Sequence, residues 1–171
     1  QNYPFINVFT KLYMNSINGA QIVSGLPNIF CGMLSIALVL LYFLNTKISL
    51  KEKLLAGAIL SAILLGFHIN TFNLLWHGFN EPSWFPYRYS FVFSFLLISF
   101  GYKSFLKLKD GIQHRQLVMC GGIFIAATIV LFRHEYDFIG IKSIYFGVFV
   151  ILLYCVLLSI LLAKSNVCHK A

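Results

Sequence analysis

Five long apolar stretches constrain this chain of 171 residues more than any other feature. About 20 residues of α-helix are needed to cross the hydrocarbon core of a membrane. Only 11% of the residues are charged and 59% are hydrophobic, whereas soluble domains carry about 25% charged residues. Too little polar sequence remains to cover the core that a soluble domain of this composition would have. We therefore expect an all-α, polytopic membrane protein with about five transmembrane helices.

The apolar stretches predict the positions of the membrane-spanning helices. They cover about residues 28–44, 54–73, 87–106, 116–132 and 141–163. Residues 1–27 precede them, and residues 164–171 form a short tail. Pro27 precedes the first stretch, and proline suits the first turn of a helix. The chain opens with Gln1 and no signal peptide, so we expect it to be a piece of a longer protein.

The distribution of lysine and arginine predicts the orientation, because cytoplasmic loops are rich in these residues. Nine of the 13 lie on one side of the expected membrane: Lys47, Lys51, Lys53, Lys103, Lys107, Lys109, Arg115, Lys164 and Lys170. The other side carries Lys11, Arg88, Arg133 and Lys142. We expect loops 45–53 and 107–115 and the tail to be cytoplasmic. Residues 1–27 and the loops around Trp84 and Glu135 then face outside.

Two classes of partner are not expected from this composition. The net charge is +8, but the cations do not form a basic stripe interleaved with exposed aromatic residues. We therefore expect membrane lipids around the chain and no nucleic acid. Cys31, Cys120 and Cys155 fall in apolar stretches, where cysteine acts as a small hydrophobic residue. Cys168 and His169 alone are too few for a zinc site, which needs about four ligands. No metal site and no other cofactor is evident.

Arg88 is the first candidate for a binding residue. It lies in NEPSWFPYRYSFVFSF, residues 80–95, where the third apolar stretch begins on the cation-poor side. A helix N-terminus there presents unpaired N–H groups and a partial positive charge. Arginine is suited to bidentate recognition of phosphate, so an anion site is one interpretation. The alternative is an arginine anchored at the lipid headgroups, with Tyr87 and its aromatic neighbours forming an ordinary interfacial belt.

Polar residues at the end of the second stretch extend this candidate site. Asn70, Asn73 and His77 are spaced to share one face if the helix continues. Polar side chains in membrane helices turn toward the bundle interior or a wet cavity. Asn70 and Asn73 are also compatible with helix–helix contacts, and His77 with a simple interfacial position. Glu81 adds a carboxylate on the same rim, or is a solvated loop acid.

The second outer loop contains the charged sequence FRHEYDF, residues 132–138. A charged connector between two helices is the ordinary interpretation. Its two carboxylates beside an arginine are also compatible with a divalent metal, a sugar or an acceptor. The spacing does not distinguish these readings.

Three segments resemble one family of bacterial membrane proteins, the YfhO family. They are GLPNIFCGML at residues 25–34, LKEKLL at residues 50–55, and LLWHGFNEPSWFPYRYSFVFSFLL at residues 74–97. The third segment is the longest and the most specific. The resemblance covers about residues 25–105, and hydropathy alone supports it beyond that point.

The resemblance implies a protein similar to the glycosyltransferase C superfamily. Such enzymes transfer a sugar from a polyprenyl-phosphate carrier to an acceptor on the outer face, here a cell-surface polymer such as lipoteichoic acid. The expected catalytic acid lies in an early outer loop that this chain does not contain. The resemblance also favours Arg88 as a ligand of the carrier phosphate, accompanied by Asn73, His77, Glu81 and Tyr87.

Two other classes of function are open on the sequence. A transporter or flippase for a lipid-linked substrate predicts broken helices and charges at the membrane midplane. No Asp, Glu, Lys or Arg lies in the middle of an expected span, and His68 is the most polar candidate there. A noncatalytic scaffold is the third class, because the catalytic loop is missing.

The charge distribution predicts which loops an impermeant thiol reagent will reach. Single cysteines replace Glu52, Lys109, Ser83 or Asp137 in a background without the native cysteines. In intact cells, we expect labelling at positions 83 and 137 and protection at positions 52 and 109 until the membrane is permeabilised. Labelling at position 52 without labelling at position 83 would invert the topology.

Overall fold

A computed structural model describes residues 4–80, 85–133 and 136–168 of the chain. This part of the chain is helical and contains no strand, which confirms the all-α prediction. In chain order the elements are η1 (Phe5–Leu12, a 3-10 helix), α1 (Gly19–Ser24), α2 (Met33–Leu44), α3 (Leu50–His68), α4 (Asn70–Trp76), α5 (Ser90–Leu106), α6 (Leu108–Gly111), α7 (His114–Leu131) and α8 (Ile141–Cys168).

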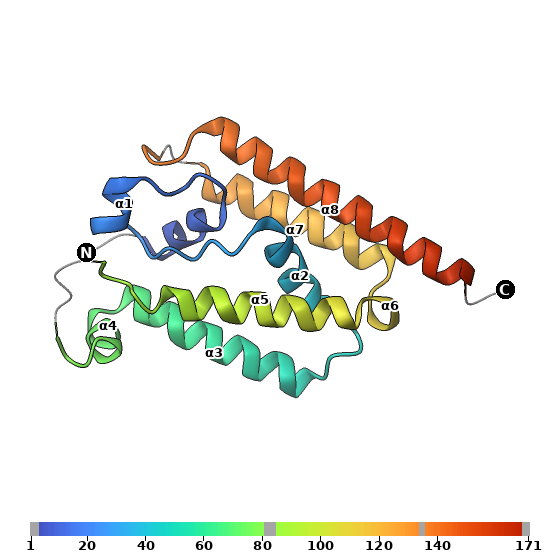
Figure 1. The fold of residues 1–171 in the computed structure, drawn as a ribbon, viewed down its shortest axis with the longest axis horizontal. Coiled ribbons are helices and arrows are strands. Elements are labelled where there is room, and N and C mark those ends of the chain that lie inside the picture. The colour runs from blue at the N-terminus through green and yellow to red at the C-terminus, as the bar shows by residue number, and fades with distance from the viewer. Residues whose placement is uncertain (1–3, 81–84, 134–135, 169–171) are drawn as a thin grey trace.

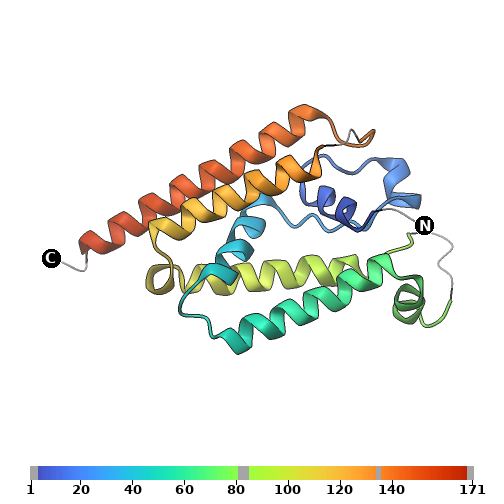
Figure 2. The ribbon, with the colours of Figure 1, turned by 180° about the vertical axis from the view of Figure 1, so that it is seen from behind.

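Two helix pairs enclose a central helix (Figures 1 and 2). Helix α7 packs along α8, and α3 packs along α5. Helix α2 lies between the pairs and contacts α5, α7 and α8. The chain alternates between the two ends of this bundle, so the segments before α2, α5 and α8 meet at one end. We call it the Arg88 end and the opposite end the Lys107 end.

The central helix is too short to cross a membrane alone. Seven of its 12 residues are buried, and at about 1.5 Å per residue it rises only about 18 Å. It begins at Met33 after Gly32, whose φ of +90° is unfavourable for residues with a side chain. The expected start at residue 28 is therefore too early, because residues 28–32 are not helical. Between the start of α2 and the Arg88 end, the interior of the bundle is filled by the non-helical residues 28–32 and by η1.

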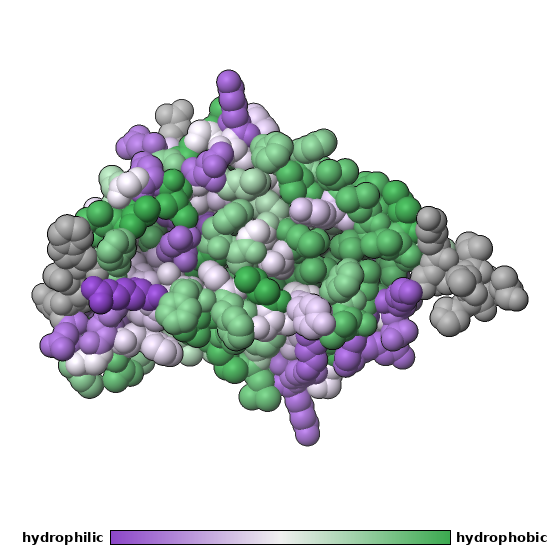
Figure 3. All heavy atoms as spheres, viewed as in Figure 1, coloured by the Kyte–Doolittle hydropathy of each residue, from purple (hydrophilic) through white to green (hydrophobic). Residues whose placement is uncertain are grey.

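The outer surface of the helices is apolar, as lipid requires. Phe91 of α5 is 70% exposed and Val118 of α7 is 76% exposed, which would be unfavourable in water. Figure 3 shows apolar side chains over the middle of the molecule and hydrophilic ones toward its ends. Helix α7 and residues 141–163 of α8 can each cross a membrane by length and composition. Helices α3 and α4 pass the same test as one bent pair, whereas α2 and α5 are shorter apolar helices.

The second expected helix, residues 54–73, differs most from the structure. It begins earlier because Ser49 caps it, with Oγ accepting a hydrogen bond from the Glu52 amide at 3.3 Å. It breaks at Ile69, where the chain bends by 107° into α4. The first turn of α3 holds Lys51, Glu52 and Lys53, which belong to the expected cytoplasmic loop, and the apolar remainder of α3 rises only about 22 Å. Helix α3 therefore has the length and composition of a membrane span only together with α4.

The remaining boundaries shift by a few residues for local reasons. Helix α5 begins at Ser90 instead of residue 87, because residues 86–89 form a turn. Helix α7 begins at His114 instead of residue 116, since Gln113 and Gln116 form a reciprocal capping box. Helix α8 continues to Cys168, so the backbone of the expected tail is partly helical.

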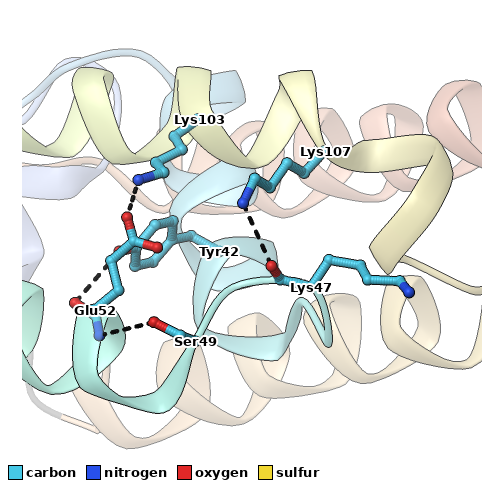
Figure 4. Close-up of polar contacts among 6 residues, drawn as sticks. All are labelled: Tyr42, Lys47, Ser49, Glu52, Lys103 and Lys107. Carbon is cyan, nitrogen blue, oxygen red and sulfur yellow. Dashed lines mark hydrogen bonds and ion pairs between the residues drawn. The ribbon is translucent and has the colours of Figure 1, made fainter.

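The two expected cytoplasmic loops lie together at the Lys107 end (Figure 4). Lys107 Nζ donates a hydrogen bond to the Lys47 carbonyl at 3.4 Å. Lys103 of α5 forms an ion pair with Glu52 of α3. Loops on one side of a membrane must end on the same side of the bundle, and these two do. Which side faces the cytoplasm stays a prediction.

Asn45 is the buried residue that joins these loops. It is 0% exposed, and its Nδ2 donates to the Lys107 carbonyl at 3.1 Å while its Oδ1 accepts from the Lys47 amide at 2.8 Å. A Cβ at Gly111 would collide with Asn45 Oδ1. The close approach of α6 therefore requires a glycine at position 111.

We expect Asn45→Ala to destabilise the protein by about 1–3 kcal/mol, because it removes two hydrogen bonds of a fully buried side chain. For a chain of this size, each kcal/mol corresponds to roughly 2–4 °C in unfolding temperature. Thermal unfolding of the detergent-purified protein measures the effect. Lys109→Ala, an exposed change on the neighbouring helix, is the control and should stay within about 0.5 kcal/mol. An Asn45→Ala protein that unfolds with the control would contradict this role.

Candidate functional site

A cavity of about 160 Å³ lies at the Arg88 end of the bundle. Three segments line it: η1, residues 17–28, and the turn that leads into α5. Lys11, Asn28, Arg88 and Ser90 supply polar or charged groups to the wall. The cavity therefore combines two cations with hydrogen-bonding groups at the end of the chain where cations are rare.

An aromatic stack holds the turn before α5. The Tyr89 ring is stacked between Trp76 of α4 and Phe67 of α3, with centroid distances of 5.3 Å and 5.1 Å. Tyr89 is buried, and burial raises the pKa of its phenol. His77 Nε2 hydrogen-bonds the Pro86 carbonyl at 2.8 Å. These contacts fix both ends of the tetrapeptide that carries Arg88.

Arg88 is exposed at the rim of the cavity, two residues before α5 begins. The adjacent Tyr89 is the N-cap residue, and its side chain does not cap the helix. The N-terminus of this 17-residue helix therefore follows Arg88 directly, and two of its first amides, Ser90 and Val92, already donate to the Tyr87 and Tyr89 carbonyls at 3.0 Å. Both features favour an anion at this position.

Lys11 forms the inner wall opposite this rim. It is 0% exposed, and its Nζ donates to the Ser16 carbonyl. The same ammonium lies over the Phe138 ring, 4.0 Å from the centroid, in a cation–π contact. Burial lowers the pKa of Lys11 from 10.5 to about 8, so the side chain is still mostly protonated at neutral pH.

The structure separates the five predicted binding residues. Arg88 and Tyr87 both line the cavity, and Tyr87 is half-buried against the Phe67 ring. His77 does not line the cavity, and it holds the turn through its hydrogen bond to the Pro86 carbonyl. Asn73 does not line this cavity; it is half-buried on α4, and its Oδ1 has no hydrogen-bond partner among the described residues. Glu81 lies outside the described residues.

Asn70, Asn73 and His77 all follow the bend at Ile69, so their helical spacing lies on α4 and its C-cap, not on the spanning helix α3. The His77 amide donates to the Asn73 carbonyl at 3.2 Å, which continues the helical pattern to His77. A local break in the backbone, invisible in the hydropathy of the segment, therefore places these residues on a separate short helix.

The loop of residues 132–138 contributes rings and a hydroxyl to the site. Phe138 supports Lys11, and Tyr136 Oη donates to Asn7 Oδ1 at 3.0 Å. Asp137 is exposed, while His134 and Glu135 lie outside the described residues. No group of three or more His, Cys, Asp or Glu side chains that could hold a metal occurs in the part of the chain that the structure describes.

A larger apolar cavity of about 700 Å³ lies on the other side of η1. Its wall comes from η1, α2, α3, α5 and α7. Phe9 and Leu12 of η1 face this cavity, whereas Lys11 faces the polar one. Along α5, Ser90 lines the polar cavity and Phe93 lines the apolar one. The two cavities therefore share η1 and the start of α5 as their common wall.

Lys11 is the residue that reasoning from the sequence missed. It appears there only as one of four cations on the cation-poor side. The available signal was its position in the apolar sequence FTKLYM, residues 9–14, because a cation in such a segment is expected to turn inward or toward a polar cavity. Asn28 and Ser90 carried no comparable signal.

A family profile described as bacterial membrane protein YfhO matches residues 1–170 of the chain. The match includes residues 106–170, where the sequence resemblance rested on hydropathy alone. No curated protein and no solved structure matches the chain.

We expect His77→Ala to loosen the turn that carries Arg88, because it removes the hydrogen bond to the Pro86 carbonyl. The loss of one such bond costs about 1 kcal/mol, measured as a lower unfolding temperature. Limited proteolysis should also cleave faster between residues 77 and 90. Asn80→Ala, an exposed change in the same connection, is the control. Equal cleavage of the two variants would show that His77 does not position the turn.

Proposed function

Because the chain belongs to the YfhO family of bacterial membrane proteins, we propose that it is part of a membrane glycosyltransferase. The enzyme takes a sugar from a polyprenyl-phosphate carrier and attaches it to a cell-surface polymer of the lipoteichoic acid type. The reaction takes place on the outer face of the membrane. Arg88 and the N-terminus of α5 bind the carrier phosphate in this proposal.

One observation carries the proposal: in a chain of this family, Arg88 lines a cavity at the cation-poor end of the bundle. A guanidinium beside helix N-terminal amides gives charge-assisted hydrogen bonds to a phosphate. The sign of the site fits the anionic part of the donor. Tyr87 and Phe85 in the same wall offer ring surfaces for the sugar.

The apolar cavity supports a lipid-linked donor over a soluble one. Its wall is shared with the polar cavity along η1 and α5, so a ligand with an anionic head and a hydrocarbon tail could contact both. Burial of the tail contributes about 25 cal/mol per Å² of apolar surface. The contribution of this chain to the proposed reaction is binding of the donor.

The bend at Ile69 favours one alternative, a transporter or flippase of a lipid-linked substrate. Transporters bind their substrates at broken helices near the bilayer midplane. Here no Asp, Glu, Lys or Arg lies in the middle of an expected span, which favours a donor bound at the membrane surface. Movement of carrier lipid between leaflets of proteoliposomes without any sugar transfer would support the transporter.

We expect Arg88→Lys to weaken donor use partially and Arg88→Ala to weaken it far more. Lysine keeps the charge but loses the planar fork of donors, whereas alanine loses charge-assisted hydrogen bonds of about 1.5–3 kcal/mol each. The measurement is sugar transfer by the full-length protein with polyprenyl-phosphate sugar, normalised to folded protein in the membrane.

Arg133→Ala is the control, an exposed cation at the same end. A purely anchoring Arg88 predicts a different pattern. Donor use per folded molecule would then stay at the wild-type level, and Arg88→Ala would lower only the yield of inserted protein.

A further inference from the structure

We propose that Lys11 is the second cation of the phosphate site, so that the anion is held between the buried ammonium of η1 and the guanidinium of Arg88. This inference rests on the proposed function and deepens it. The ligand is a phosphate ester, and the selectivity is for an anionic head over a neutral or zwitterionic one.

The position of Lys11 is the first argument. It lines the same cavity of about 160 Å³ as Arg88, yet the two residues are 77 positions apart in the sequence. Burial disfavours the charged form of Lys11. A phosphate in the shared cavity offsets this effect.

The surroundings of Lys11 are the second argument. Two of its partners, the Ser16 carbonyl and the Phe138 ring, are neutral. An ammonium has three donors arranged around one nitrogen, and an anion is a stronger acceptor than either partner. In this proposal a phosphate oxygen in the cavity accepts from the same ammonium.

An incompletely satisfied hydroxyl lies beside this lysine. Ser16 is 1% exposed, and its Oγ has no hydrogen-bond partner among the described residues. The next residue, Ile17, lines the cavity. A buried hydroxyl without a partner is unfavourable and often marks a place where a ligand or water is bound.

The test compares ligand binding by Lys11→Met, Lys11→Gln and the wild type in nanodiscs of zwitterionic lipid, with the full-length protein. Methionine fills the site without charge. Glutamine also lacks the charge but can donate a hydrogen bond to the Ser16 carbonyl. Lys142→Met is the matched control, because Lys142 is an exposed cation at the same end. The probes are polyprenyl phosphate, the neutral polyprenol and inorganic phosphate.

We expect both Lys11 variants to bind polyprenyl phosphate at least about tenfold more weakly, as for the loss of one charge-assisted contact. Binding of polyprenol should be unchanged, and Lys142→Met should bind polyprenyl phosphate like the wild type. Without ligand, the unfolding temperature of Lys11→Met should equal or exceed that of the wild type, because a buried charge is removed. If the wild type binds inorganic phosphate as tightly as polyprenyl phosphate, the ligand of Lys11 and Arg88 is free phosphate and not a lipid.

Two results would overturn the inference. If Lys11→Gln binds polyprenyl phosphate like the wild type, Lys11 only holds the Ser16 backbone. If both Lys11 variants bind normally while Arg88→Ala does not, the phosphate site exists without Lys11 and the proposed function survives. Absence of polyprenyl-phosphate binding by the wild type would instead overturn the proposed function together with this inference.

Discussion

The short central helix is the constraint on which the rest of the structure depends. With 12 residues, α2 covers about 18 Å of a hydrocarbon core of about 30 Å. Irregular backbone is tolerated at membrane depth only where protein buries it or where it lines a polar cavity. The non-helical residues 28–32 and η1 occupy the space beyond α2, enclosed by the two helix pairs. Because α2 ends short of the Arg88 end, these irregular segments and not a helix line the cavity there.

The same constraint explains why cations gather at one cavity on a cation-poor side. Lys11 belongs to η1, which lies beyond the start of α2, and Arg88 to the turn that precedes α5. The aromatic stack on Tyr89 and the His77 hydrogen bond hold that turn in place. At the opposite end, Asn45 joins the two basic loops through backbone carbonyl and amide groups. Neutral hydrogen bonds and aromatic contacts therefore hold both ends of the bundle in place.

Hydropathy and charge were sufficient to predict the class of fold, the five apolar helical segments and the clustering of the two basic loops. They failed where backbone geometry decides: the late start of α2 after Gly32, the break at Ile69, and the turn before α5. Among the described helices, two, or three if the bent pair α3 and α4 counts as one span, can cross a membrane by length and composition. Lys11 was missed because it lines one cavity with Arg88 through tertiary packing, which no local pattern encodes. Asn73 and His77 keep their helical spacing, but the bend at Ile69 places it on α4 and its C-cap and not on α3.

The central claim is that the cavity between η1 and the turn before α5 receives the phosphate end of a lipid. Photo-crosslinking with a polyprenyl phosphate that carries a diazirine beside its phosphate tests this claim most directly. The account predicts that the label maps by peptide mass spectrometry to residues 5–12 and 85–90, and that unlabelled polyprenyl phosphate competes with it while polyprenol does not. Label on loops 45–53 and 107–115, or label that polyprenyl phosphate does not displace, would contradict it.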